Sequence, residues 1–190
     1  MNLLVLGPQG AGKGTQAKRI AEAYGIPHVS TGEMFRAAIA AGTELGRRVQ
    51  PILDAGELVP DELTVALIRE RLAEPDAGEG FVLDGFPRNL AQAEALDETL
   101  AAIDRSLDAI LFFDVPDEIA VARLRKRAEE EGRRDDTPEV IARRLAIYHA
   151  DTEPVVEHYR ASGKLVPLHA GRTVAEVWGE IEDALSGVAA

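Results

Sequence analysis

A glycine-rich loop directly follows a short apolar run at the start of the chain. Residues 7–15 read Gly-Pro-Gln-Gly-Ala-Gly-Lys-Gly-Thr, residues 3–6 before them are apolar, and residues 16–21 after them favour a helix. The glycines let several backbone N–H groups point at the same phosphate oxygens, and the positive end of the following helix faces them too. This strand–loop–helix context predicts a site for a nucleoside triphosphate, with Lys13 reaching its outer phosphates.

Strand-like and helix-like segments alternate along the rest of the chain, which is typical of a parallel sheet covered by helices. Besides the first strand, apolar runs predict strands at residues 28–29, 81–83, 109–115 and 165–168. The last of these is expected at an edge of the sheet, because Pro167 cannot donate to a strand ladder. We therefore predict an α/β fold, a five-stranded parallel sheet with helices on both faces.

Two segments fit a core of alternating strands and helices poorly. Residues 30–59 have the pattern of a helix pair without strands, and residues 126–136 form a short polar run. We expect both to be insertions over the C-terminal edge of the sheet, where ligands of such folds bind. The core would then consist of residues 1–29, 60–125 and 137–190.

Composition and charge exclude several classes of function. The chain has 21 Lys and Arg against 33 Asp and Glu, a net charge of −12, which disfavours non-specific binding to nucleic acid. It has no cysteine, which excludes disulfides, thiolate zinc sites and thiol catalysis. Its apolar runs are too short to span a bilayer, and no basic leader precedes the first strand. We expect a soluble, cytoplasmic monomer that does not bind membranes.

An acidic residue and an arginine close the apolar strand at residues 81–83. Asp84 ends the strand and Arg88 follows in a tight turn. Asp84 is expected to hold Mg²⁺ through water, since this ion usually keeps several waters. Thr15 is a weaker candidate, because Gly14 displaces it by one position from the general motif. Arg88 is suited to fork two hydrogen bonds onto a phosphate.

Basic residues gather in one 22-residue stretch that holds eight of the 21: Arg123, Arg125, Lys126, Arg127, Arg133, Arg134, Arg143 and Arg144. Interspersed acidic residues leave open that these are paired charges on solvated helix faces. The spacing of Arg123 and Arg127 places them on one face of a helix, and Arg133 and Arg144 flank the start of the next. As a set they could converge where two polyphosphates meet, with Asp135 and Asp136 holding them when no ligand is bound.

These features together resemble the adenylate kinase family. Its phosphate loop reads Gly-x-x-Gly-x-Gly-Lys-Gly-Thr, which matches residues 7–15 and includes the late threonine. The resemblance covers essentially the whole chain. It implies reversible phosphoryl transfer from Mg²⁺-bound ATP to AMP, giving two ADP, and a role in keeping nucleotide pools balanced. The short run at residues 126–136 has no cysteine, so the chain resembles the short-lid, zinc-free members.

The resemblance also implies which residues contact each nucleotide. ATP is expected at Gly10, Ala11, Gly12, Lys13, Gly14, Thr15, Arg123, Arg127, Gly171 and Arg172. AMP is expected at Thr31, Arg36, Glu57, Leu58, Val59, Gly85, Phe86, Pro87, Arg88, Gln92, Arg133 and Arg144. The residues expected to promote the transfer itself are Lys13, Arg88, Arg127, Arg133 and Arg144.

Two other functions remain open at this stage. A UMP/CMP kinase of the same fold is the nearest. The resemblance favours adenine over a pyrimidine, because Thr31 and Gln92 match what the adenine-specific relatives carry. Gln also offers a donor and an acceptor to a base edge, and adenine presents both. A phosphate-loop regulatory protein is more remote, because it needs no second arginine-lined pocket. No catalytic base is expected, since the acceptor phosphate, with a second pKa of about 6, is already largely dianionic.

Overall fold

Five parallel strands form the centre of the protein. The structure is a computed structural model and describes residues 1–131 and 136–188. The strands are β1 (Asn2–Leu6), β2 (His28–Ser30), β3 (Phe81–Asp84), β4 (Ala109–Asp114) and β5 (Leu165–His169). They pair in parallel in the order β2-β3-β1-β4-β5. The predicted α/β class is confirmed, and β5 lies at an edge, as Pro167 predicts.

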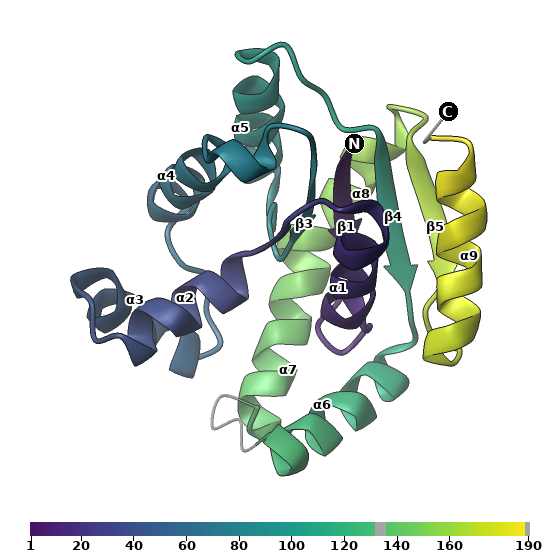
Figure 1. Ribbon diagram of the computed structural model, residues 1–190. Helices are drawn as coiled ribbons and strands as arrows, with labels where there is room; N and C mark the ends of the chain where they lie inside the picture. The colour runs from purple at the N-terminus through teal and green to yellow at the C-terminus, as the bar shows by residue number, and fades with distance from the viewer. Residues whose placement is uncertain (132–135, 189–190) are drawn as a thin grey trace.

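Helices follow each strand (Figure 1). They are α1 (Lys13–Tyr24), α2 (Thr31–Ala40), α3 (Glu44–Asp54), α4 (Asp61–Leu72), α5 (Leu90–Ala101), α6 (Asp117–Glu131), α7 (Pro138–Ile147), α8 (Glu153–Arg160) and α9 (Val174–Ser186). A short 3₁₀ turn (Pro75–Ala77) precedes β3, and a π-helical turn (Tyr148–Thr152) joins α7 to α8. Within the described ranges, no helix combines the length and hydropathy needed to cross a membrane.

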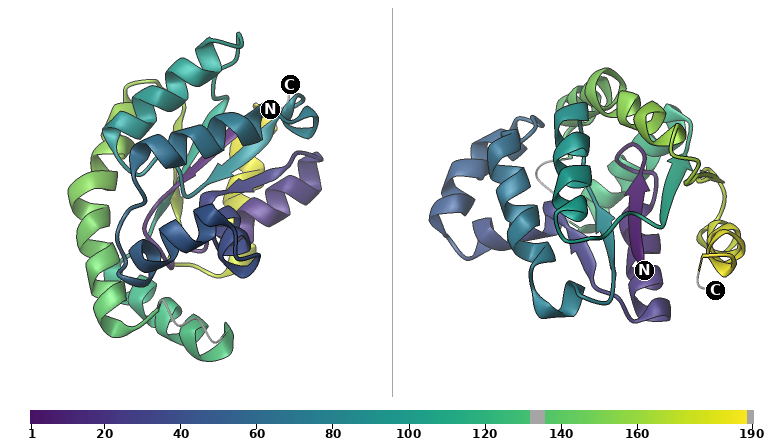
Figure 2. Two further views of the ribbon diagram at one scale, coloured as in Figure 1. Left: turned by 90° about the vertical axis from the view of Figure 1, so that its left-hand side faces the viewer. Right: turned by 90° about the horizontal axis from the view of Figure 1, so that it is seen from above.

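The strands bury side chains on both faces, because successive residues of a strand point to opposite sides. Leu3 and Val5 of β1 pack with α1 and α9, whereas Leu4 and Leu6 pack with α4, α5 and α8. Figure 2 shows α9 and α8 on opposite sides of the sheet. Such two-sided burial explains the almost continuous apolar sequence of β1.

Helices α2 and α3 stand apart from this core, to one side of the sheet (Figure 1). They pack in a small apolar cluster around Phe35, Val49 and Val59, against which Leu63 and Leu67 of α4 also pack. Ser30 caps α2 by accepting from the Glu33 backbone, but the Glu33 carboxylate pairs with Lys18 of α1. The start of α2 is therefore joined to β2 by a cap and to α1 by an exposed ion pair.

Helix α6 lies beyond the C-terminal ends of the strands and continues to Glu131 (Figure 1). The first part of the polar run at residues 126–136 is therefore helical and continuous with α6. Asp136 and Thr137 follow the segment 132–135, which lies outside the described residues, and Thr137 caps α7 with Pro138 at its first position. Helix α6 thus lies beyond the same ends of the strands as the phosphate loop, and α7 leads back from it toward the sheet (Figure 1).

Candidate functional site

A cavity of about 780 Å³ opens at the C-terminal ends of the strands. Its walls combine the glycine-rich loop, the turn after β3, helices α6 and α7, and the start of α9. A second, small cavity of about 40 Å³ shares Glu57, Leu58, Gly85 and Arg88 with the first. Segments far apart in the sequence therefore meet around two adjoining cavities.

Nearly all residues with a predicted ligand contact line these cavities. The larger one takes in residues 10–15 and 85–88 together with Arg36, Glu57, Leu58, Asp84, Arg123, Arg127, Arg144 and Arg172. The smaller one takes in Thr31, Val59 and Gln92. Gly171 lines neither, whereas its neighbours Ala170 and Arg172 line the larger one. Arg133 lies outside the described residues, as do Arg134 and Asp135.

The glycine-rich loop runs so close to the neighbouring backbone that two positions exclude a side chain. A Cβ on Gly7 would lie 2.7 Å from the Phe113 carbonyl oxygen, and one on Gly10 would lie 2.5 Å from that of Ala120. Both glycines also have positive φ angles, of 140° and 84°, a region that other residues rarely adopt. The loop is thereby wedged between β4 and α6 with its backbone bordering the cavity.

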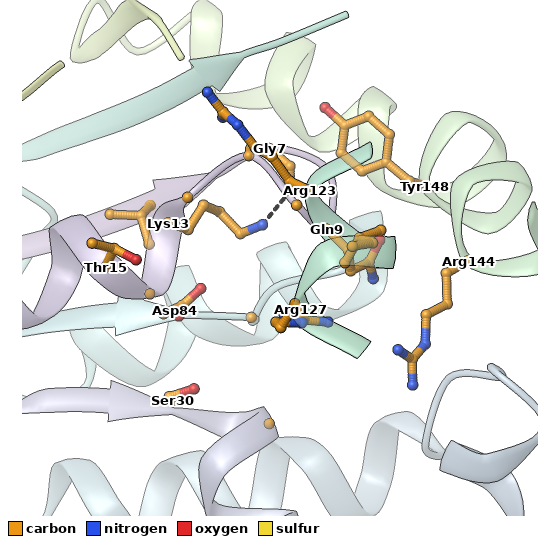
Figure 3. A pocket seen from close by; sticks show the side chains of 18 of the residues that line it. Gly7, Gln9, Lys13, Thr15, Ser30, Asp84, Arg123, Arg127, Arg144 and Tyr148 are labelled. Carbon is orange, nitrogen blue, oxygen red and sulfur yellow. Dashed lines mark hydrogen bonds between the residues drawn. The ribbon is translucent and has the colours of Figure 1, made fainter. Parts of the chain in front are cut away.

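Lys13 points back over this loop. Its Nζ donates to the carbonyl oxygens of Gly7 and Pro8, at 2.7 and 2.8 Å, and Figure 3 shows it between the loop and Asp84. Burial lowers the pKa of Lys13 to about 8, because the Asp84 carboxylate offsets only part of the desolvation and Arg88 and Arg127 add positive charge. The ammonium is therefore held where anionic oxygens would stabilise it.

Asp84 lies buried at the end of β3. Its Oδ2 lies 3.4 Å from Nε2 of His28, which belongs to the neighbouring strand β2. Burial opposes ionisation of this carboxyl, but the His28 hydrogen bond and the charge of Lys13 outweigh it and hold the pKa of Asp84 below its ordinary value. The site thus contains a carboxylate that remains charged at neutral pH.

The turn after β3 is braced by hydrogen bonds to one carbonyl. The Gly85 oxygen accepts from Oγ1 of Thr31 at 2.9 Å and from Nε of Arg88 at 2.8 Å. Gly85 has φ of 79°, and a Cβ there would lie 2.8 Å from the Thr31 hydroxyl. Arg88 is consequently anchored at Nε, with its guanidinium on the wall shared by both cavities.

The carboxamide of Gln92 has hydrogen-bond partners within the chain. Its Oε1 accepts from the backbone N–H of Arg88 at 2.8 Å, and its Nε2 donates to Asp61 at 2.7 Å. One N–H of the amide and one lone pair of its oxygen are left for further partners, so contact of Gln92 with a base edge stays a prediction. Asp61 gave no sequence signal, because an acid in the first turn of α4 looks like an ordinary helix start.

Asp136 holds two of the predicted transfer arginines, as the sequence predicts for that carboxylate. Nε and Nη2 of Arg127 donate to its two oxygens at 2.8 and 3.0 Å, and Nη1 of Arg144 donates at 2.9 Å. The Asp136 side chain is fully buried, whereas those of Arg127 and Arg144 are 29% and 12% exposed. Figure 3 shows both arginines at the cavity, from α6 and α7.

Arg123, one helical turn before Arg127, connects α6 to the loop before α9. Its guanidinium donates to the carbonyl oxygens of Ala170 and Arg172, at 2.7 and 3.0 Å. This places a planar cation at the far end of the cavity from Arg144.

One ion pair and two buried oxygens around the cavity had no clear signal in the sequence. Arg143 of α7 forms an ion pair with Glu57 at 2.8 Å, and so joins α7 to the segment after α3. Gln9 and Gln16 each have a buried Oε1 without a hydrogen-bond donor in residues 1–131 and 136–188. Both glutamines line the larger cavity.

The donor set fits a magnesium ion that arrives with a nucleotide better than a resident metal. Residues 1–131 and 136–188 hold no cluster of three or more His, Cys, Asp or Glu side chains that could bind a metal ion. Asp84 offers one buried carboxylate beside Lys13. Mg²⁺ is commonly bound by one or two carboxylates together with waters and substrate phosphates.

A model of the adenylate kinase family matches residues 5–164 of the chain. The chain belongs to the adenylate kinase family. It is 51% identical over 190 residues to an adenylate kinase of Caulobacter vibrioides, with all of both chains covered. It is 49% identical over 180 residues to one of Cyanothece sp., covering 95% of this chain and 92% of the relative. An adenylate kinase of Archaeoglobus fulgidus is 43% identical over 215 positions, with 99% of each chain covered.

Proposed function

We propose that this adenylate kinase family member transfers a phosphoryl group reversibly from Mg²⁺-bound ATP to AMP, giving two ADP, and so balances adenine nucleotide pools. One observation carries the proposal. In a single cavity, a phosphate loop with Lys13 lies opposite arginines from the β3 turn, α6 and α7. The full-length similarity to adenylate kinases supports the same conclusion.

ATP would lie on the phosphate loop, residues 10–15, with its base toward Arg123 and Arg172. In the ligand-free protein Lys13 donates to the carbonyl oxygens of Gly7 and Pro8. On binding of ATP it would donate to the outer phosphates instead. Asp84 would hold Mg²⁺ through water, and the ion supplies charge that offsets the repulsion between phosphate oxygens.

AMP would lie in and beside the smaller cavity, which Thr31, Val59 and Gln92 line. Its phosphate would face Arg36, Arg88 and Arg144, which line the larger cavity. Backbone at Glu57, Leu58 and Val59 and the turn at residues 85–88 would complete the pocket. We include Arg133 among the phosphate-binding residues on the family resemblance alone.

The chemistry would depend on charge and alignment. Two anions must approach in line, so the positive groups lower the barrier by offsetting their repulsion. Arg127 and Arg144, which donate to Asp136 in the ligand-free protein, would donate to the phosphates under transfer instead. The acceptor phosphate is largely dianionic near neutral pH, its second pKa being about 6, so it attacks without a base.

Water competes with AMP as acceptor, so the cavity must exclude it before transfer. We propose that residues 30–59 and 126–136 are the parts that close. Helices α2 and α3 pack in a small cluster separate from the two large ones around the sheet, although α4 contributes to it. An exposed Glu57–Arg143 ion pair connects the segment after them to α7. Such an exposed pair is weak enough to break and re-form.

We also propose that the protein works as a cytoplasmic monomer, since a net charge of −12 makes copies repel one another. Sedimentation at several concentrations tests the monomer. The activity is tested by supplying Mg²⁺ and ATP with AMP, UMP, CMP or no acceptor, and measuring ADP and the other diphosphate separately. Rapid turnover with AMP alone is expected. Preference for UMP or CMP would overturn the base assignment, and slow hydrolysis alone would favour a regulatory protein.

A further inference from the structure

His149 lies between the starts of two helices. Its Nε2 lies 2.9 Å from Oδ2 of Asp117, the first residue of α6, and its Nδ1 lies 3.1 Å from Oε2 of Glu153, the first residue of α8. His149 itself belongs to the π-helical turn that follows α7, so one imidazole connects α6, the end of α7 and α8. We call Asp117, His149 and Glu153 the His149 bridge.

The turn that carries His149 is wide because a proline follows it. Pro154 lies in the first turn of α8 and has no N–H, so the carbonyl of Ala150 cannot accept an α-helical bond from it. The backbone N–H of Glu153 instead donates to the carbonyl of Tyr148, five residues back, which is the π-helical pattern. The local sequence therefore produces the turn from which His149 reaches both carboxylates.

Both ring nitrogens of His149 face carboxylate oxygens, and only the doubly protonated ring can donate at both. A neutral imidazole has one N–H, so its other nitrogen would set a lone pair against a carboxylate and one of the two contacts would be lost. The bridge as the structure shows it therefore requires the imidazolium, whichever carboxylate keeps its bond when the proton leaves.

The titratable groups that contact the ring come from three elements: Asp117 from α6, Glu153 from α8 and Tyr148 from the turn itself. The hydrogen bonds to Asp117 and Glu153 raise the pKa of His149 above its ordinary value. Tyr148 packs edge-on, with the ring centres 5.3 Å apart. It stays neutral, because burial and nearby carboxylates, among them Asp114 at the end of β4, raise its pKa as well.

The bridge belongs to the two helices that carry transfer arginines. Arg127 of α6 and Arg144 of α7 are linked through Asp136, and nucleotide phosphates would compete for that link. They would not compete for the His149 bridge, because none of its three residues lines the larger cavity. Asp117 precedes Arg127 by ten residues, about 15 Å along a helix. The bridge can therefore hold the start of α6 while the arginines change partners.

We propose that His149 is a positioning residue for phosphoryl transfer: as an imidazolium it fixes the start of α6 against the end of α7 and the start of α8, and loss of its proton slows the transfer step. The inference rests on the proposed function, because Arg127 and Arg144 matter here as groups that meet the phosphates.

The direction of the effect follows from where the bridge lies. Helix α6 begins three residues after β4 ends, and α8 packs on the sheet through Val155 and Val156. Residues 126–136, the part proposed to close, lie at the other end of α6. Loosening the bridge would therefore misplace the arginines rather than release a closing segment. Since the bridge is complete below the pKa of His149 and incomplete above it, transfer should slow as the pH rises through that value.

The test measures the transfer step itself, by rapid quench of the first turnover at saturating Mg²⁺-ATP and AMP, between about pH 7 and 9. The wild type should slow about two- to fivefold over this range, the size of effect that exposed ion pairs can have. His149→Arg stays charged and should keep the faster rate at high pH. His149→Gln is never charged and should be slow throughout.

His158→Gln is the matched control. His158, on α8, pairs with a carboxylate of α5, Asp97 at 3.0 Å, rather than with α6. This variant should keep the wild-type rates and pH profile. The inference is overturned if the wild-type transfer step does not change with pH or becomes faster as the pH rises, since faster transfer would mean that the bridge opposes closure. It is also overturned if His149→Gln keeps the wild-type pH profile.

Proton NMR of the His149 ring follows the bridge without an activity assay. Asp117→Asn and Glu153→Gln should each lower the pH at which the ring titrates, and if neither does, the inference is overturned. Failure of the proposed function is distinguishable, since the wild type would then transfer nothing from ATP to AMP at any pH. The titration would still decide whether His149 bridges the two carboxylates.

Discussion

Asp136→Asn removes the buried carboxylate that Arg127 and Arg144 share. Three charge-assisted hydrogen bonds end on its oxygens, and removing one partner from a buried ion pair typically costs about 3–5 kcal/mol. Arg127 is 29% exposed and can be partly rehydrated, so we expect the lower end of that range. A loss of about 3 kcal/mol corresponds to a fall in Tm of roughly 6–12 °C for a domain of this size.

The same substitution should strengthen binding of a ligand that occupies both phosphate sites. In the wild type the phosphates must displace Asp136 from the two arginines, whereas in the variant no carboxylate competes. If half of the loss of about 3 kcal/mol is recovered on binding, an analogue that joins ATP and AMP through an extra phosphate should bind about tenfold more tightly.

Urea unfolding gives the first quantity and calorimetric titration with the analogue gives the second. Glu129→Gln is the control, because it removes the same charge from an exposed position on α6; its effect should stay within about 0.5 kcal/mol. Two results would refute the reasoning. A stability loss within the range of the control would mean that the buried network contributes little. Weaker binding of the analogue would mean that Asp136 positions the arginines in the complex as well.

Three further predictions concern the phosphate and base contacts. In the ligand-free protein the pKa of Lys13 is about 8, so kcat/KM for ATP should fall as the pH rises through that value. The value of kcat should fall only at higher pH, because bound phosphates favour the ammonium. If an active Lys13→Arg variant kept the same fall of kcat/KM at alkaline pH, the fall would belong to another group. Arg88→Ala should reduce turnover by several orders of magnitude and Arg125→Ala, on the exposed side of α6, should have little effect; equal losses in steady-state assays would contradict this division of the arginines. Gln92→Leu should weaken AMP binding and also destabilise the free protein, by about 1–3 kcal/mol, because it leaves the Arg88 N–H without its acceptor and leaves Asp61 with only the donor from Asn89. Unchanged unfolding in urea would show that the hydrogen bonds of Gln92 contribute nothing.

Features that depend on neighbouring residues were predictable from the sequence. The phosphate loop follows from glycines, a lysine and the strand and helix beside them. Asp136 was predictable as a partner of the arginines because it lies nine residues after Arg127 and eight before Arg144. The edge position of β5 follows from one proline, because its missing N–H affects a single local ladder.

Contacts between distant segments were not predictable in this way. His28 meets Asp84 across 56 residues, and Glu57 meets Arg143 across 86. Each of these side chains is ordinary within its own helix, strand or loop, and only the order of the strands and the placement of α7 bring the partners together. Gln92 is a further case: its residue type suits a base edge, and nothing in the sequence indicated that its oxygen also accepts from the backbone N–H of Arg88.

Four cations that face the cavity are engaged with acceptors of the chain itself. Lys13 donates to two loop carbonyls, Arg123 to two carbonyls before α9, and Arg127 and Arg144 to Asp136. Nucleotide binding would therefore exchange one set of acceptors for another, and each exchange gains far less than the full strength of the new bond.

The gain in binding free energy also differs between the phosphate loop and the arginines around Asp136. A phosphate that displaces a neutral carbonyl adds a favourable charge interaction, whereas one that displaces Asp136 replaces one anion by another. We infer that the phosphate loop dominates affinity for the donor. The arginines around Asp136 would contribute mainly when both nucleotides are present and their total negative charge exceeds that of one carboxylate.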